Sequence, residues 1–569
     1  MYIIPSVKKV EKGEKIVLDG CQFAFPDNID IRIVKLCEKI PTGKKVVTFE
    51  IFESESEEYK IIFGDKINII AQSSKGAFYA VQTLRQIIKN GYCDAKQIND
   101  KPDFEARGFY YDITRGRVAT LETLKKLVDN MAYYKLNQLQ LYVEHVFPFK
   151  EYDGVYQKMG YITPEEIKEL DAYCKENFVE LVPSLSCFGH LYELLQNTKY
   201  EYLCELENYE PQTIYWCERM GHHTIDVSNP ESIEIIKSLI DQYSPCFTSD
   251  KFNICCDETF DLGNGRNKGK DKGRLYVDFV KQVIAHVKSK GKRAMMWGDV
   301  INQHPELIDE FDEDVIFMSW GYSPNESPNM VYKFRDAKRP QYVCPGISNW
   351  TSLIEMPNSS VPNITKMVQY GYESGAIGVL NTCWGDYGQI SPIYACMYGM
   401  IFGAAKSWNA TANYDGFDEG IDLLYYGYQG AADIVKRIAK AHRCCYWYSL
   451  LVKYSNEKFG NDRMKLWHEP EPDEYNEAFA EIEDVIPYLM GTTWENESAR
   501  KALLVVAEGV EIMIAMLMSR TTGEKMGVNL KDAEEWLVKY KEEYLKESKM
   551  GELKEFIHVF YELAQKHLG

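Results

Sequence analysis

The stretch Phe252-Asn253-Ile254-Cys255-Cys256-Asp257-Glu258-Thr259-Phe260 joins a short apolar run to two adjacent carboxylates. An apolar run of this length without glycine or proline predicts a buried strand, and the carboxylates stand where that strand must end. The loop that follows, residues 261–273, contains four glycines, so we expect it to be flexible and open to solvent. The acid pair is therefore the predicted chemical centre of the chain.

The sequence around this strand alternates strand signals with helix signals. Apolar residues at i, i+3 and i+4 spacing predict the helices, and two of these begin at a Thr163-Pro164-Glu165-Glu166 capping box and at Asn229-Pro230. Eight such repeats predict an α/β fold with a (β/α)8 TIM barrel, whose catalytic groups come from the C-terminal ends of its strands. The predicted strands are residues 109–113, 138–143, 179–183, 252–256, 294–297, 315–320, 341–344 and 378–383.

Segments of different character flank the predicted barrel, so we expect three domains. Residues 1–101 show strand patterns and one helical pattern, which predicts a small α/β domain. Residues 102–410 would form the catalytic barrel, with a polar excursion at 196–224 building the rim of a site. Residues 411–569 would form a helical domain that supports the barrel. Its predicted helices are residues 431–451, 473–490, 499–520 and 530–567.

The composition argues against some classes of binding partner and indicates a cellular compartment. A formal net charge of -20 argues against nucleic acid and against an anionic membrane surface. We find no run near ~18 consecutive apolar residues and no secretory signal at the N-terminus, so no membrane association is expected. The 15 cysteines have no regular spacing, which suits free thiols in the cytoplasm. The protein is expected to be a monomer or a homodimer.

Unusual side chains stand at the ends of the predicted strands. Flat indole faces stack on pyranose rings, carboxylates and arginine hold hydroxyl groups, and a carboxyl pair can do acid-base work on a glycosidic bond. A ring of tryptophans around two acids therefore predicts a sugar pocket. The candidate residues are Arg107, His190, Asp257, Glu258, Trp297, Trp320, Trp350, Trp384 and Asp386.

The spacing of the two acids limits the mechanism. Adjacent residues at the end of an extended strand point to opposite sides, so Asp257 and Glu258 are poorly placed as a nucleophile and an acid that face each other across one bond. Another nucleophile is needed, and a 2-acetamido group of the substrate could supply it.

Several short motifs, taken in their order along the chain, resemble the family 20 glycoside hydrolases, the exo-β-N-acetylhexosaminidases. The run of residues 138–145, with residues 253–263 and Cys344-Pro345-Gly346, looks closest to the branch of that family that includes the cytosolic hexosaminidase D-type enzymes. The motifs are Ala106-Arg107-Gly108-Phe109-Tyr110-Tyr111-Asp112, Tyr133-Tyr134-Lys135-Leu136-Asn137, Cys187-Phe188-Gly189-His190, Cys256-Asp257-Glu258 and Thr382-Cys383-Trp384-Gly385-Asp386.

The resemblance implies an activity and a role for each matching residue. The activity would be retaining hydrolysis of terminal β-linked N-acetylglucosamine or N-acetylgalactosamine through an oxazolinium intermediate, without a cofactor or a metal. Glu258 would be the general acid and then the base, and Asp257 would orient the acetamido group. The resemblance also implies that Arg107 binds hydroxyl groups and that His190 supports the polar network. Trp384 and Asp386 would contact the sugar, and Trp297, Trp320 and Trp350 would complete the pocket.

Other readings of the same residues stay open. An Asp-Glu pair at the start of a loop is often only a solvated helix entry. A sugar-binding protein on an inactive scaffold would keep the pocket without the activity, and an unrelated barrel hydrolase would use more distant carboxylates. A metal site at Glu144 and His145, or at Cys255 and Cys256, lacks a tetrahedral set, and the glycines of residues 263–274 lack the Gly-Lys-Ser/Thr ending of a phosphate loop.

Overall fold

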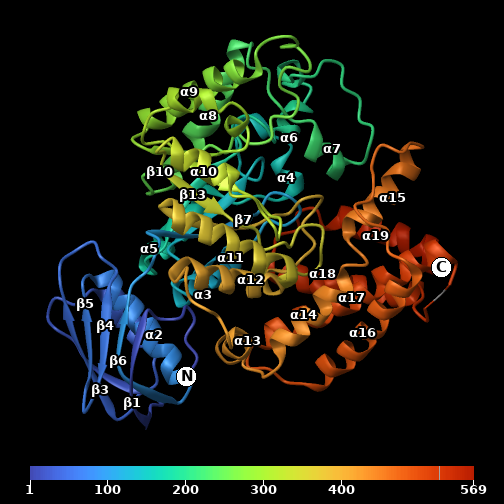
Figure 1. Cartoon of the computed structure of the whole chain (residues 1–569). Coiled ribbons are helices and arrows are strands. Elements are labelled where there is room, and N and C mark those ends of the chain that lie inside the picture. Colours follow the sequence, from blue (N-terminus) through green and yellow to red (C-terminus); the bar gives the residue numbers. More distant parts are fainter. Residues whose placement is uncertain (525) are drawn as a thin grey trace.

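A computed structural model describes residues 1–524 and 526–569 of the chain, and a closed parallel barrel lies at its centre (Figure 1). The strands follow each other around the barrel in the order β10-β11-β12-β13-β14-β7-β8-β9. Each of the eight predicted strands corresponds to one of these, so the predicted (β/α)8 barrel is confirmed. Their bounds are β7 (Ala106–Asp112), β8 (Gln138–Val143), β9 (Glu180–Leu185), β10 (Lys251–Asn253), β11 (Arg293–Trp297), β12 (Ile316–Trp320), β13 (Gln341–Cys344) and β14 (Gly378–Cys383).

Amphipathic helices cover the outside of the barrel. The capping box of Thr163 and Glu166 and the side-chain cap of Asn229 are both present where the sequence predicts them. The helices are α3 (Leu121–Tyr133), α5 (Pro164–Glu176), α8 (Pro230–Tyr243), α9 (Lys272–Ser289), α10 (Asn329–Asp336), α11 (Pro357–Ser374) and α12 (Met397–Trp408). The excursion after β9 carries two short helices, α6 (Tyr192–Leu195) and α7 (Tyr215–Gly221).

The strand predicted at residues 252–256 is displaced and shorter in the structure, where it is β10. It ends at Asn253, because Cys255 and Cys256 adopt left-handed backbone angles with φ of 56° and 65°. Glu258 follows with φ of 46°. Such angles cost a non-glycine residue on the order of 1–3 kcal/mol each, so the surrounding structure must hold them. Asp257 and Glu258 therefore lie in a turn and not in an extended strand. The expectation that their side chains alternate along a strand is wrong.

The N-terminal region is a six-stranded sheet in the order β1-β6-β4-β5-β3-β2, with α1 (Ile31–Cys37) and α2 (Ser74–Lys89). It joins the barrel through buried charges: Lys135 Nζ lies 3.0 Å from Asp100 Oδ2, and Trp408 Nε1 donates to Asp100 Oδ1 at 3.0 Å. The strands are β1 (Lys9–Val17), β2 (Cys21–Ala24), β3 (Lys45–Ile51), β4 (Tyr59–Phe63), β5 (Ile67–Ala71) and β6 (Tyr92–Asp100).

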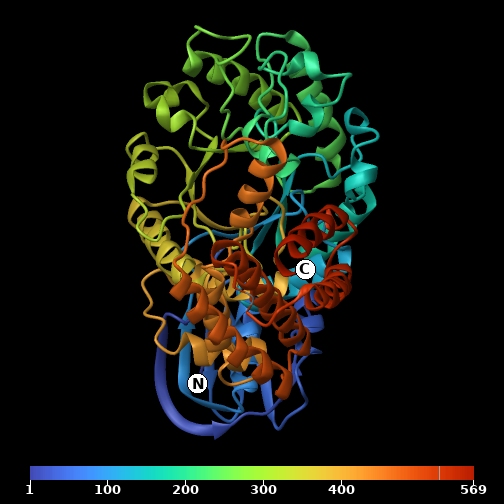
Figure 2. The same ribbon diagram turned by 90° about the vertical axis from the view of Figure 1, so that its right-hand side faces the viewer.

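The C-terminal region is helical, as predicted, but two of its predicted helices are each broken in two. The predicted helix 431–451 is divided because the chain turns at residues 443–446, and the predicted helix 530–567 is divided at Gly551, whose φ is 48°. Figures 1 and 2 show this region packed along one side of the barrel. The main helices are α14 (Ala431–His442), α15 (Trp447–Phe459), α16 (Pro472–Gly491), α17 (Glu497–Thr522), α18 (Leu530–Glu547) and α19 (Leu553–Leu568).

Helix α17 is long and apolar enough, by length and composition alone, to cross a membrane, with a mean hydropathy of 2.0 in its most apolar window. The sequence did not predict a membrane-spanning helix here because Glu508 and Glu511 interrupt the run of apolar residues. Within the fold, 72% of that window is buried, and α17 packs against α16, α18 and α19. Burial among these helices accounts for its composition.

Candidate active site

A pocket of about 300 Å³ lies at the C-terminal ends of the barrel strands. Trp297 and Trp320 are the last residues of β11 and β12, and Trp384 directly follows β14. This is the face on which (β/α)8 barrels carry their active sites. The lining residues are Arg115, His190, Met220, Asp257, Glu258, Phe260, Trp297, Trp320, Tyr322, Trp350, Trp384, Asp386, Tyr387 and Trp467.

The structure brings together eight of the nine candidate residues, and Arg107 is the exception. Arg107 is the second residue of β7, at the opposite end of the barrel, where it is fully buried. Its guanidinium pairs with Glu57 Oε2 at 2.6 Å and donates to the backbone oxygen of Lys135 at 2.9 Å. The prediction that Arg107 binds sugar hydroxyls is therefore wrong, and its charge instead joins the N-terminal sheet to the barrel.

Arg115 is the arginine of the pocket, and it was not predicted from the sequence. Asp112, the last residue of β7, positions it: the Asp112 carboxylate accepts from the backbone N–H of Arg115 at 3.0 Å and from its Nε at 2.7 Å. The other side of the guanidinium contacts Asp386 Oδ1 at 2.7 Å. The rule that sites form at C-terminal strand ends could have selected Arg115 over Arg107.

Asp112 also fixes the loop that carries Trp384 and Asp386. The backbone N–H of Gly385 donates to Asp112 Oδ2 at 3.0 Å. A Cβ on Gly385 would lie 2.6 Å from the backbone oxygen of Arg115, so only glycine allows these two segments to approach so closely. One buried carboxylate thus places both polar groups on this wall of the pocket.

The two acids of the pair meet at one histidine. His190 Nε2 lies 3.5 Å from Asp257 Oδ2 and 3.4 Å from Glu258 Oε2. Burial by itself lowers the pKa of His190, but the two carboxylates outweigh it and raise that pKa to about 10. His190 is therefore a cation at neutral pH, and both carboxylates contact the same ring nitrogen.

The backbone around His190 is built to hold this contact. A Cβ on Gly189 would lie 2.6 Å from the backbone oxygen of Asp257, so glycine is required at that position. The backbone N–H of His190 donates to Nδ1 of His223 at 2.8 Å, and the two rings stack with centroids 4.3 Å apart. Burial and the His190 charge lower the pKa of His223 to about 3, so His223 stays neutral and acts as an acceptor.

Two further acids in and beside the pocket have raised pKa values. Burial, with the nearby charge of Asp257, raises the pKa of Asp299 to about 7, and Asp299 Oδ2 accepts from the backbone N–H of Glu258 at 3.0 Å. Burial raises the pKa of Asp386 to about 6 although Arg115 opposes the shift. Raised pKa values of this kind are concentrated at functional sites. Asp299 was not among the candidate residues.

Aromatic rings form the remaining walls. Trp384 Nε1 donates to the hydroxyl of Tyr322 at 2.7 Å, and Trp297 and Trp384 pack with centroids 5.7 Å apart. Tyr322 in turn stacks on Trp320 at 5.1 Å. Five lining residues besides Arg115 were not among the candidates from the sequence. These are Met220, Phe260, Tyr322, Tyr387 and Trp467.

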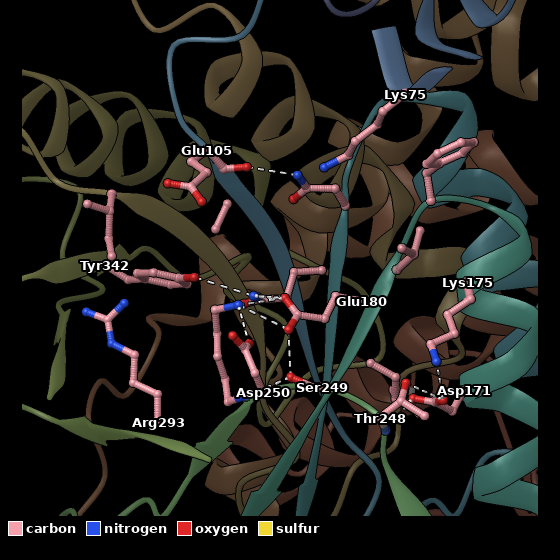
Figure 3. A pocket seen from close by; sticks show the side chains of 18 of the residues that line it. Lys75, Glu105, Asp171, Lys175, Glu180, Thr248, Ser249, Asp250, Arg293 and Tyr342 are labelled. Atoms are coloured by element: carbon pink, nitrogen blue, oxygen red, sulfur yellow. Dashed lines mark hydrogen bonds and ion pairs between the residues drawn. The ribbon is translucent and has the colours of Figure 1, made fainter. Parts of the chain in front are cut away.

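A second, larger hollow of about 520 Å³ lies at the opposite end of the barrel (Figure 3). Glu180, the first residue of β9, lies at its centre, where it accepts from Ser249 Oγ at 2.6 Å and from Lys251 Nζ at 3.1 Å. Lys175 and Asp171 form another pair in its wall. These groups satisfy each other, and the N-terminal face of a barrel serves stability, so this hollow is not the candidate site.

The described part of the chain, residues 1–524 and 526–569, contains no group of three or more His, Cys, Asp or Glu side chains that could hold a metal ion. The side chains of the pocket offer carboxyl groups, an imidazole and a guanidinium, together with indole faces.

The charge on His190 makes a testable contribution to stability. Its pKa is raised from 6.5 to about 10 in the folded state, so its protonation stabilises the fold fully below pH 6.5 and this contribution is lost as the pH rises through 10. We expect His190→Asn to lower Tm most near pH 6.5, with a difference from wild type that shrinks toward pH 10 in a thermal-shift series. The exposed His558 provides a control, His558→Asn. A His190→Asn difference that is constant with pH would contradict the assignment.

Two models of one family match the chain. The model described as "Glycosyl hydrolase family 20, catalytic domain" matches residues 104–334, and "Glycosyl hydrolase family 20, domain 2" matches residues 25–101. Together they cover more than half of the chain.

Curated relatives carry related names. A beta-hexosaminidase of Porphyromonas gingivalis is 26% identical over 287 residues, which are 43% of this chain and 36% of that protein. Hexosaminidase D of Homo sapiens is 22% identical over 213 residues, 36% of this chain and 41% of that protein. The chain therefore spans less than half of the length of either relative.

Solved structures share the fold. A chitobiase of Flavobacterium johnsoniae superposes with a TM-score of 0.59 at 16% identity, covering 100% of this chain and 99% of that one. An N-acetyl-beta-hexosaminidase of Streptomyces plicatus gives 0.58 at 18% identity, covering 74% and 94%. The family models, the relatives and this shared fold agree with the order of motifs in the sequence, and the chain belongs to glycosyl hydrolase family 20.

Proposed function

We propose that the protein hydrolyses terminal, non-reducing β-linked N-acetylhexosamine residues, with the gluco or the galacto configuration. The observation that carries the proposal is the adjacent pair of Asp257 and Glu258, both in contact with His190 inside a tryptophan-walled pocket. The names of the relatives, which include beta-hexosaminidases, support the same activity.

The size of the pocket supports action at a chain end. A volume of about 300 Å³ is at the small end of the range for ligand pockets, which suits one sugar ring rather than several. Trp297, Trp320 and Trp384 offer indole faces for the apolar faces of that ring. Arg115 and Asp386, held together on one wall, are suited to bind its hydroxyl groups.

The mechanism we propose uses the substrate's own acetamido group as the nucleophile. Asp257 accepts a hydrogen bond from the acetamido N–H, and the acetamido oxygen attacks the anomeric carbon while Glu258 gives its proton to the leaving oxygen. The bond from the anomeric carbon to the leaving group breaks as the oxazolinium ring closes. Glu258 then takes a proton from water, which opens the ring with net retention.

The placement of the acids supports this mechanism over a covalent glycosyl-enzyme. Retaining enzymes that use two carboxylates set them about 5–5.5 Å apart on opposite sides of the bond. Here the two acids are adjacent in the chain and both contact the same nitrogen, His190 Nε2. In this mechanism the Asp257 carboxylate lies beside the positively charged oxazolinium ring, where a negative charge stabilises it.

We also propose the cellular compartment in which the protein acts. All fifteen cysteines are free thiols, and thirteen of them are buried. Such usage suits a reducing compartment, and the cytoplasm remains our proposed site of action.

The direct test is steady-state hydrolysis of aryl β-N-acetylglucosaminide and β-N-acetylgalactosaminide beside the plain β-glucoside and β-galactoside. We expect turnover of the acetamido sugars alone, because only they carry the nucleophile, and the ratio between the two identifies the preferred epimer. Binding of N-acetyl sugars without any turnover would instead identify a sugar-binding protein on this scaffold.

Loss of the proposed general acid should be measurable on its own. We expect Glu258→Gln to lower kcat by about 10²–10⁴ on a natural disaccharide, and by less on an aryl glycoside whose leaving group needs little protonation. The exposed Glu306, outside the pocket, provides a matched control, Glu306→Gln. Near-normal turnover of the disaccharide by Glu258→Gln would remove Glu258 from this role.

A further inference from the structure

We propose that Trp467, from the C-terminal helical region, is a platform on which the second sugar ring of the substrate stacks, so that the enzyme prefers oligosaccharides to small alkyl glycosides. The inference rests on the proposed function and deepens it by assigning the side of the site that holds the leaving group.

Trp467 differs from the other lining residues in origin and in exposure. The other thirteen come from the barrel and its loops, whereas Trp467 lies between α15 and α16. Trp467 is 56% exposed, against 1% for Trp297 and 7% for Trp384, and Phe260, another lining residue, is 53% exposed. The pocket therefore has a buried inner part and an outer rim with two large exposed aromatic rings. Such rings at the mouth of a site indicate a binding surface.

One face of the Trp467 ring is covered and fixed. It stacks on Tyr448 with centroids 4.1 Å apart and an interplanar angle of 15°. Tyr448 packs on Tyr387 of the barrel at 4.8 Å, and the backbone oxygen of Tyr387 accepts from Trp447 Nε1 at 3.2 Å. Tyr446 also approaches this ring, with centroids 6.3 Å apart and an interplanar angle of 68°. Trp467 is still 56% exposed, so these contacts fix the ring and leave much of it open to a ligand.

The segment that carries Trp467, residues 460–471, is tied to α15 on both sides of the ring. Asn456 bonds Met464 through both its amide nitrogen and its amide oxygen, at 2.9 and 3.2 Å, and Lys453 pairs with Glu469 at 3.1 Å. Asn461 donates to the backbone oxygen of Gln212, in the excursion after β9, at 2.8 Å. Figures 1 and 2 show α15 reaching away from the other C-terminal helices toward α7.

The position of Glu258 indicates which part of the substrate would contact Trp467. The terminal sugar fills the inner part of the pocket, and Glu258 must lie beside the glycosidic oxygen to protonate it. The leaving group therefore extends outward from Glu258, past Phe260, whose backbone N–H donates to the Glu258 backbone oxygen at 2.7 Å. A second pyranose presents a flat C–H face that can stack on an indole, whereas a methyl group is too small to reach it.

The test compares a β-N-acetylglucosaminyl disaccharide with methyl β-N-acetylglucosaminide. We expect Trp467→Ala to lower kcat/KM for the disaccharide by about tenfold, mainly through KM, and to change kcat/KM for the methyl glycoside by less than about twofold. Trp467→Phe should recover most of the loss because it restores a stacking face. The matched control is Tyr488→Ala, which removes a 45% exposed aromatic ring of α16 that lies outside the pocket.

The experiment distinguishes an error in the role of Trp467 from an error in the proposed function. Equal losses on both substrates in Trp467→Ala would mean that the ring only supports the site, and an unchanged disaccharide rate would mean that it does not touch the leaving group. Either result overturns this inference and leaves the proposed function intact. A wild-type protein that hydrolyses neither substrate overturns the proposed function and the inference with it.

Discussion

The left-handed turn at Cys255, Cys256 and Glu258 is the constraint on which the site depends. Strand β11 and helix α9 hold it by hydrogen bonds to its backbone: Trp297 N–H donates to the Cys255 oxygen at 3.0 Å, and the Tyr276 hydroxyl donates to the Cys256 oxygen at 2.8 Å. The Glu258 N–H donates in turn to Asp299. A backbone conformation that these residues would not adopt alone is thus fixed by the barrel, and it turns two adjacent carboxylates toward one histidine.

Charge balance follows from this turn. The two neighbouring carboxylates of the pocket repel each other, and the His190 cation that contacts both of them offsets that repulsion. His223 remains neutral beneath His190, so the cluster gains one positive charge and not two. Arg115 plays the same part for Asp112 and Asp386. Each of these two pairs of acids is therefore held beside a cation.

Much of the fold could be predicted from the sequence because its signals are local. Apolar runs mark the eight strands, and the residues after them mark the face that carries the site. Arg107 was wrongly predicted because it was taken from the family resemblance although it lies at the N-terminal end of its strand, where the rule that sites form at C-terminal strand ends excludes it. The break after α14 was missed because residues 443–446 contain neither glycine nor proline, so that tertiary contacts and not local propensity decide the turn. The break between α18 and α19 does have a local signal, Gly551, which a single glycine in a helical pattern does not make decisive. Trp467 gave no signal because its contact with the site joins segments about eighty residues apart or more.

The central claim is that Asp257 holds the acetamido group as its oxygen closes on the anomeric carbon. The most direct test is a calorimetric titration of a thiazoline mimic of the cyclised intermediate into wild-type protein and Asp257→Asn. A charged carboxylate that binds the ring should give wild type an affinity about tenfold or more above that of the variant, because charge-assisted hydrogen bonds are the stronger kind. Equal affinities would contradict the account, since Asp257 would then have no part in recognising the intermediate.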